Sequence, residues 1–245
     1  MRYIPNSAEE RAKMLAEMGV QSIEDFFTSI PAHLRLEKPL NLPPAYAESE
    51  LIKFFKKLAA RNTDPNNTIS FLGAGAYNHF RPIVIDTLIS RSEFYTTYTP
   101  YQPEIAQGTL QAIFEFQSMI CLLTGMEVAN ASMYDGSTAM AEAALMANRI
   151  TRRKKILVSQ AVHPEYRAVL NTYLKSTGLV SETVAFSASG QTVLDSINLD
   201  SEVAAVIVQS PNFFGCIEDM AAVAEKAHQA GALFISVTTE PISWG

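Results

Sequence analysis

The spacing of apolar residues divides the chain into two regions of different character. Residues 1–65 are predicted to form helices interrupted by prolines. In the helix expected at residues 48–60, apolar side chains such as Leu51 and Leu58 recur at helical spacing. Ser7 is suited to begin an earlier helix and Gly19 to end it, and residues 22–29 are expected to form a second short helix. We therefore predict a helical N-terminal arm or subdomain over residues 1–65.

Residues 66–245 are predicted to form one large α/β domain. A long helix is expected from Glu104 to about Thr124, closed by Gly125, and a short helix is expected at residues 82–90. The runs 156–158 and 203–208 are apolar without alternation, which is typical of strands covered by helices on both faces. Strands are predicted at residues 127–133, 156–159, 182–186, 203–209 and 233–238, and helices at 137–150, 164–177, 191–198 and 217–230.

Alternating strands and helices of this kind predict a mostly parallel sheet flanked by helices. The last predicted strand ends near residue 238 and the sequence ends at residue 245, so the sheet is expected to be incomplete at its C-terminal end.

The composition argues against several kinds of partner and site. With 48% hydrophobic and 18% charged residues the chain is typical of globular proteins, and a net charge of −6 disfavours nucleic-acid or anionic-membrane partners. Two cysteines without a CxxC motif predict neither a disulfide framework nor a metal site.

No apolar run is long enough to span a bilayer, and no signal peptide is recognisable, so a cytoplasmic location is expected.

Residues 133–139 form the first candidate site. A predicted strand, a glycine turn and the hydroxyls of Ser137 and Thr138 open a helix, an arrangement that can bind an anion. Pyridoxal phosphate enzymes of the aspartate aminotransferase fold hold the cofactor phosphate in such a turn. On this motif alone, an ordinary helix cap is the more common explanation.

Three further residues follow predicted buried strands, at the sheet edge where α/β proteins bind ligands. His163 is placed to stack on a cofactor ring or to cap the next helix. Asn212 is placed to donate to a ring oxygen or to form an Asx turn. Glu240 follows the last predicted strand. At this position, active pyridoxal phosphate enzymes of the aspartate aminotransferase fold have an aspartate that pairs with the pyridinium nitrogen of the cofactor. The pair Gly73 and Gly75 lacks the third glycine of a dinucleotide fingerprint and favours a tight turn instead.

Two segments without a clear period, 71–80 and 95–104, are rich in aromatic and hydrogen-bonding side chains. Together with residues 98–108 (YTPYQPEIAQG) and 209–215 (QSPNFFG), the segment 71–80 (FLGAGAYNHF) resembles glycine dehydrogenase (decarboxylating), the P-protein of the glycine cleavage system. The resemblance is to its subunit 1 and spans essentially the whole chain. It implies a pyridoxal-phosphate type I fold, with the small C-terminal domain of the family absent from this sequence.

In that family, decarboxylation of glycine uses pyridoxal 5'-phosphate bound covalently by a His-Lys motif in the other subunit, and the aminomethyl group passes to the lipoyl H-protein. Here no lysine follows a histidine or ends a late strand. The resemblance therefore implies that subunit 2 is the partner, that this chain alone is inactive, and that its own pocket is vestigial. The vestigial cofactor residues would be Ser137, Thr138, His163, Asn212 and Glu240. The nine lysines are Lys13, Lys38, Lys53, Lys56, Lys57, Lys154, Lys155, Lys175 and Lys226.

Loops of related chains complete each other's cofactor pockets in this fold, and aperiodic loops often carry function. The residues expected to contribute to the partner's site are Tyr98, Tyr101, Gln102, Glu104, Asn78 and His79. An alternative is that these residues only seal the interface between subunits, where tyrosine is common. Two other functions stay open at this point: an assembly scaffold with a silent pocket, and a self-contained pyridoxal phosphate enzyme.

Overall fold

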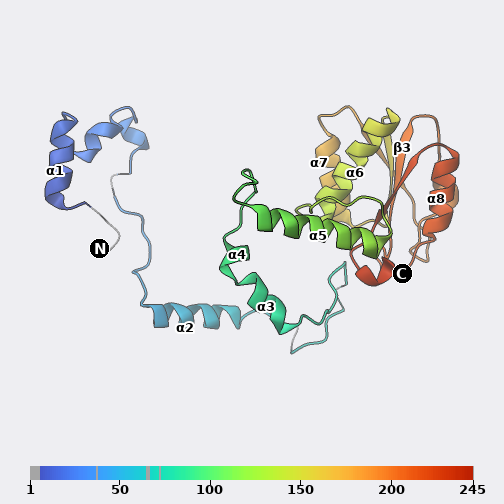
Figure 1. Ribbon diagram of the computed structural model, residues 1–245, viewed down its shortest axis with the longest axis horizontal. Coiled ribbons are helices and arrows are strands. Elements are labelled where there is room, and N and C mark those ends of the chain that lie inside the picture. The colour runs from blue at the N-terminus through green and yellow to red at the C-terminus, as the bar shows by residue number, and fades with distance from the viewer. Residues whose placement is uncertain (1–5, 37, 65–66, 72, 245) are drawn as a thin grey trace. The chain divides into compact units, whose positions relative to one another are not determined.

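The computed structural model describes residues 6–36, 38–64, 67–71 and 73–244. The chain divides into two compact units, Met1–Thr68 and Ile69–Gly245. The predicted boundary between residues 65 and 66, like residue 72 of the 71–80 segment, lies outside the described residues. Figure 1 labels the main helices and the central strand.

The first unit is helical. Helix α1 (Ala8–Glu17) begins at Ser7, whose hydroxyl accepts the Glu10 N–H while the Glu10 carboxylate accepts the Ser7 N–H. The predicted second helix is a 3₁₀ helix, η1 (Ile23–Phe27), and a further 3₁₀ turn, η2, covers Ala32–Leu34. Helix α2 (Glu48–Ala59) confirms the predicted helix at residues 48–60.

The second unit contains a four-stranded parallel sheet, which confirms the predicted fold class. Its strands are β1 (Lys155–Ser159), β2 (Val180–Val184), β3 (Val203–Gln209) and β4 (Leu233–Val237). The spatial order is β2-β1-β3-β4, and each neighbouring pair runs parallel. The chain therefore moves outward in one direction from β1 and in the other direction from β3, so the order reverses between these two central strands.

Helices cover both faces of the sheet. Helix α6 (Gly136–Thr151) and helix α7 (Pro164–Leu174) lie on one side of β3, and helix α8 (Met220–Gln229) lies on the other (Figure 1). Ile207 of β3 packs toward α6 and α7, whereas its neighbour Val206 packs toward α8. All seven residues of β3 are buried, as expected for a strand covered on both faces.

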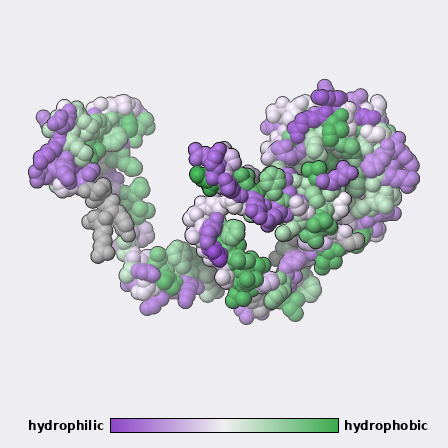
Figure 2. Space-filling view, viewed as in Figure 1, coloured by the Kyte–Doolittle hydropathy of each residue, from purple (hydrophilic) through white to green (hydrophobic). Residues whose placement is uncertain are grey.

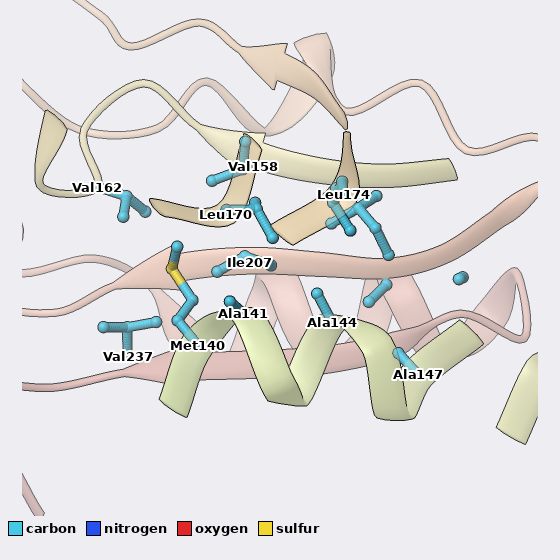
Figure 3. Close-up of a cluster of buried hydrophobic side chains, with 13 residues drawn as sticks. Met140, Ala141, Ala144, Ala147, Val158, Val162, Leu170, Leu174, Ile207 and Val237 are labelled. Atoms are coloured by element: carbon cyan, nitrogen blue, oxygen red, sulfur yellow. The ribbon is translucent and has the colours of Figure 1, made fainter. Parts of the chain in front are cut away.

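Small residues let α6 approach the sheet closely. Ala141, Ala144 and Ala147 lie along the helix face that points at the strands, with Met140 at the end nearest Val237 (Figure 3). Leu170 and Leu174 of α7 complete this layer of the core. The resulting close-packed region holds the carboxyl ends of β1 and β3 in fixed positions, and the candidate site is built there.

The segment before the sheet consists of helices with little burial. These are α3 (Ile83–Ile89), α4 (Ser92–Tyr95) and α5 (Gln107–Thr124). Gly125 ends α5 in the left-handed conformation at φ 70°, as predicted. Hydrophobic surface gathers over α3 (Figure 2), where Ile83 and Ile89 are exposed.

Two predicted elements were wrong. Residues 127–133 form no strand, because Ser132 has a φ of 134° and the Ala129 carbonyl accepts the side chain of Gln117. Residues 191–198 form only a 3₁₀ turn, η3 (Leu194–Ser196). There Thr192 pairs with Phe186 in an isolated antiparallel bridge, which takes the backbone away from helical hydrogen bonding.

The last 3₁₀ turn, η4, covers Pro241–Trp244. Within the described part of the chain, no helix has the length and apolar character needed to cross a membrane.

Candidate functional site

The loops that follow β1 and β3 meet at the carboxyl edge of the sheet. The His163 N–H donates to Gln209 Oε1 over 2.9 Å, and the Phe213 N–H donates to the Ala161 carbonyl over 2.9 Å. The rings of His163 and Phe213 lie edge to face with centroids 5.0 Å apart. Because the strand order reverses between β1 and β3, this is the edge where open α/β sheets bind ligands.

The turn before α6 is closed by its own aspartate. Asp135 Oδ1 accepts the Thr138 N–H at 2.8 Å and the Ser137 hydroxyl at 2.6 Å. The Thr138 hydroxyl also lies 3.1 Å from the same oxygen. These hydrogen bonds, led by the one from Ser137, lower the pKa of the Asp135 carboxyl. Both hydroxyls predicted for a phosphate therefore serve the N-cap of α6 instead.

Tyr166 covers the same turn. A Cβ added to Gly136 would come within 2.5 Å of the Tyr166 hydroxyl oxygen, so the phenol rests against the glycine backbone. Burial, followed by the negative charge of Asp135, raises the pKa of Tyr166. The ring also lies beside His163, with centroids 5.2 Å apart. Tyr166 and Asp135 thus both contact the first turn of α6.

His163 and Asn212 are both engaged in local structure. His163 Nδ1 accepts the Glu165 N–H at 3.2 Å and so caps α7. Asn212 donates one amide hydrogen to the Gly190 carbonyl and the other to Glu218, each over 2.7 Å, while its Oδ1 accepts the Phe214 N–H. Asn212 thus forms the Asx turn, and both of its amide hydrogens are used within the protein.

The donor set at this edge does not fit pyridoxal phosphate. A phosphate at the start of α6 would face the Asp135 carboxylate, which already accepts the donors that a phosphate would need. An imine with the cofactor needs a lysine near the ring. Lys155 begins β1 at the opposite edge and bonds Asp200, and Lys226 on α8 donates to the Leu194 carbonyl.

Glu240 and His79 come together from distant parts of the second unit. Glu240 Oε2 lies 3.3 Å from His79 Nε2. The loop that carries His79 also lies close to the turn after β4, because a Cβ on Gly75 would be only 3.4 Å from Thr239 Oγ1. The sequence placed His79 in a partner-facing loop and Glu240 in a vestigial pocket, and no local pattern connects them.

The segment Tyr98–Glu104 forms a compact exposed loop. Tyr98 and Tyr101 are 81% and 79% exposed, with ring centroids 6.4 Å apart. Backbone hydrogen bonds from Tyr101 to Thr99 and from Ile105 to Gln102 give the loop internal structure. An open hollow of about 480 Å³ lies beside it, and Gln102 contributes to its lining. Glu104 is exposed at the end of the same loop.

Three residues important at this edge were not among the predicted site residues. Asp135 carries a local signal, since an aspartate three residues before Thr138 at the start of a helix is typical of an N-cap. Tyr166 lies one helical turn after His163. Glu218 has no such signal, because its hydrogen-bond partners come from other segments.

Among the described residues, no three His, Cys, Asp or Glu side chains gather as a metal site requires.

Solved structures define the class of fold. The chain is similar to sphingosine-1-phosphate lyase of Burkholderia pseudomallei, with a TM-score of 0.61 at 13% identity over 82% of this chain and 48% of that one. It is also similar to mouse CSAD, with a TM-score of 0.54 at 15% identity over 94% of this chain and 48% of that one. With the four-stranded parallel sheet, these likenesses define a pyridoxal-phosphate type I fold.

More similar proteins define the family. The glycine cleavage system P-protein family matches residues 1–245. A probable glycine dehydrogenase (decarboxylating) subunit 1 of Koribacter versatilis is 54% identical over all of this chain and 56% of its own length. Its counterpart in Bacillus cereus (strain ATCC 10987) is 53% identical over 100% of this chain and 55% of its own length.

A crystal structure of glycine decarboxylase (P-protein) in inhibitor-bound form gives a TM-score of 0.84 at 47% identity, over 100% of this chain and 54% of that one. The chain belongs to the glycine cleavage system P-protein family, and it spans about half the length of the curated relatives that it matches.

Proposed function

We propose that this chain acts as a noncatalytic subunit of glycine decarboxylase. In this proposal a second, lysine-bearing subunit binds pyridoxal 5'-phosphate covalently and decarboxylates glycine, and the aminomethyl group passes to the lipoyl H-protein. The present chain completes the partner's site. Family membership over residues 1–245 and the relatives' name, subunit 1, support this assignment.

The observation that carries the proposal is the cap formed by Asp135. Its carboxylate accepts the hydrogen bonds of Ser137 and Thr138 that would otherwise hold a phosphate. Tyr166 lies against the same turn, at Gly136. A subunit whose own phosphate turn is filled by a carboxylate contributes to catalysis only through residues that reach another chain.

The Tyr98–Glu104 loop is the best candidate for that contribution. Its two tyrosines are exposed, and its backbone is folded by hydrogen bonds within the loop, so little ordering is needed when it contacts a partner. Hydroxyl and amide groups of Tyr98, Tyr101 and Gln102 are then available to bind groups in a neighbouring pocket. Asn78 and His79, on the loop before α3, are the next candidates for the same contribution.

The experiment is to co-express this chain with a lysine-bearing P-protein subunit and measure glycine–bicarbonate exchange in the presence of H-protein. Tyr98→Ala and Gln102→Ala are expected to lower the exchange rate at least about tenfold while the two chains still co-purify. Matched controls are Tyr134→Ala, which removes another fully exposed tyrosine, and Gln111→Ala on the exposed side of α5. Both controls are expected to keep the exchange rate of the unmodified complex.

If all four variants assemble and exchange at the unmodified rate, the loop takes no part in the active site. The chain would then be an assembly scaffold, a function favoured by the long helix α5, which buries none of its described residues in this chain. A self-contained pyridoxal phosphate enzyme predicts a borohydride-reducible imine absorbance with this chain alone. The filled turn at Asp135 leads us to expect no such band.

A further inference from the structure

The turn before α6 contains a chemically labile pair of residues. Asp135 is followed by Gly136, and no other aspartate or asparagine in the sequence precedes a glycine. An aspartyl side chain can cyclise onto the backbone nitrogen of the next residue, and glycine hinders this least because it has no Cβ. Both residues are exposed, so water reaches them. The pair therefore has the composition and the solvent access that isoaspartate formation requires.

The reaction needs only the chain and water. The Gly136 nitrogen attacks the side-chain carboxyl carbon of Asp135, and a C–N bond forms while the hydroxyl of the protonated carboxyl leaves with the amide hydrogen as water. One water molecule then opens the resulting five-membered imide at either carbonyl. When it cleaves the bond to the backbone carbonyl, the chain continues through the Asp135 side chain. The product has one additional backbone carbon and the same mass, and no atom is oxidised or reduced.

The folded structure opposes the first step. Asp135 Oδ1 accepts the Ser137 hydroxyl at 2.6 Å and the Thr138 N–H at 2.8 Å, so the carboxyl is turned toward α6. The backbone of Asp135 is extended, with ψ at 175°, whereas a five-membered ring through its Cα and carbonyl carbon needs a different ψ. The same hydrogen bonds, led by that from Ser137, lower the pKa of the carboxyl and favour its unreactive ionised form. The cap must therefore open before the ring can close.

Isomerisation would in turn destroy the cap. Helix α6 begins at Gly136, and its first turn leads directly into the buried side chains of Met140 and Ala141. An additional backbone carbon at the N-cap moves the carboxylate away from the Thr138 N–H, which then loses its acceptor. A modified chain is thus expected to have a loosened start of α6.

We propose that the bond between Asp135 and Gly136 is a latent site of isoaspartate formation, which the N-cap of α6 keeps closed in the folded chain. Modification proceeds through transient opening of the cap, so its rate follows the fraction of molecules in which the Asp135 carboxyl is released. The proposal goes beyond the function proposed above, because it assigns a covalent modification to this chain whether or not a partner subunit is present.

The test is to incubate the chain of residues 1–245 at mildly acidic pH, folded and in urea, and to quantify isoaspartate by peptide mapping with mass spectrometry. Isoaspartate at residue 135 is expected to accumulate at least about tenfold faster in urea than in the folded chain. Ser137→Ala removes the 2.6 Å hydrogen bond and is expected to raise the rate in the folded chain about fivefold, the effect of one lost hydrogen bond on the opening equilibrium.

Two kinds of control belong to this test. Ser118→Ala removes a serine hydroxyl that bonds the Phe114 carbonyl within α5, and it is expected to leave the rate at residue 135 unchanged. Asp195 and Asp200 are each followed by serine, the next least hindered context, and they serve as references within the same sample. Their rates in the folded chain are expected to be the same with and without Ser137→Ala.

Equal rates in the folded and the urea-unfolded chain, no isoaspartate at residue 135 in either state, or an unchanged rate in Ser137→Ala would each overturn the proposal. Asp135→Ser keeps a capping hydroxyl but has no carboxyl, so a signal that persists in this variant also overturns it. If circular dichroism shows that Ser137→Ala does not fold, Thr138→Val, which removes the hydroxyl 3.1 Å from Asp135 Oδ1, is expected to raise the rate in the same direction. An unchanged rate in that variant overturns the proposal as well.

Discussion

Asn212 donates a hydrogen bond of 2.7 Å to Glu218 Oε1, and both side chains are buried, at 2% and 7% exposure. The same carboxylate accepts the N–H and the hydroxyl of Thr192. Glu218 therefore ties the turn after β3 to the segment around Thr192 and to the approach to α8. This arrangement holds Phe213, the neighbour of Asn212, against His163 at the carboxyl edge of the sheet.

Replacing Glu218 with alanine is predicted to destabilise the second unit strongly. The substitution leaves the buried amide of Asn212 and the Thr192 N–H without their acceptor, at roughly 1–3 kcal/mol for each unpaired group. Glu218→Gln is expected to destabilise less, because one oxygen remains an acceptor. Urea denaturation followed by circular dichroism measures both changes in the free energy of unfolding.

The control for this pair is Glu225→Ala on α8, where an exposed carboxylate accepts a hydrogen bond from Gln229 one turn later in the helix. Its effect is expected to stay within about 0.5 kcal/mol. Equal losses in the Glu218 and Glu225 variants would contradict the role assigned to the buried carboxylate.

Replacing Gly136 with alanine is predicted to destabilise the fold by about 1–3 kcal/mol through overpacking. Its Cβ would come within 2.5 Å of the Tyr166 hydroxyl oxygen and 3.1 Å of the ring. Gly108→Ala in α5 has open space around the new Cβ and is expected to stabilise by about 0.4–1 kcal/mol instead. Urea denaturation of both variants tests whether the change in the free energy of unfolding has opposite signs.

A double-mutant cycle identifies the cause of that loss. Tyr166→Leu removes the phenol that faces Gly136, so adding Gly136→Ala in that background is expected to cost less than in the unmodified chain. Additive losses would show that the contact between Gly136 and Tyr166 does not limit the packing of this turn.

The contribution of Asp135 to stability is predicted to depend on pH. Its pKa is lowered in the fold by the hydrogen bonds from Ser137 and Thr138. The stabilisation is therefore fully present above the unfolded pKa, about 3.9, and is lost as the pH falls through the lower folded value. Asp135→Asn keeps an acceptor but has no charge. We expect the difference in the free energy of unfolding between the unmodified chain and Asp135→Asn to shrink as the pH is lowered from about 6 to about 2.5.

Unfolding midpoints in urea at these two pH values measure the difference directly. Subtracting the asparagine variant cancels the other carboxyl groups, which titrate in both proteins. A difference that stays constant with pH would mean that the Asp135 charge does not stabilise the cap of α6.

The charge on Asp135 is also predicted to affect the titration of Tyr166. Burial is the main reason that the pKa of Tyr166 is raised, and the Asp135 charge adds to it. In Asp135→Asn the pKa of Tyr166 is expected to move only part of the way back toward the usual value near 10. The measurement is the Tyr166 ¹³Cζ resonance followed against pH, with Asp195→Asn, a change on the η3 turn, as the control.

In the assembled complex, the hydroxyl and the ring of Tyr98 are predicted to have separable effects. If the hydroxyl binds a group in the partner's pocket, Tyr98→Phe should lower the glycine–bicarbonate exchange rate nearly as much as Tyr98→Ala. If the ring only seals the interface, Tyr98→Phe should exchange normally while Tyr98→Ala weakens co-purification. Exchange rates and the yield of co-purified complex, measured on the same preparations, distinguish the two outcomes.

Much of the α/β architecture could be predicted from local sequence. The predicted strand 203–209 matches β3 residue for residue, and Gly125 ends α5 where its conformational freedom predicted. The turn that opens α6 was also located correctly. These features depend on side chains close together in the chain, so periodicity and capping preferences report them directly.

The occupancy of the candidate site was decided by tertiary structure. Asp135 was visible in the sequence, but only the folded chain brings Tyr166 against Gly136. Glu218 reaches Thr192 and His79 reaches Glu240 across long stretches of chain, and segment 127–133 forms no strand. The sequence by itself thus determined the buried central strand β3 and the point at which α5 ends. The tertiary structure decided which side chains contact the turn before α6 and that His79 lies beside Glu240, because these contacts join segments whose local patterns carry no information about each other.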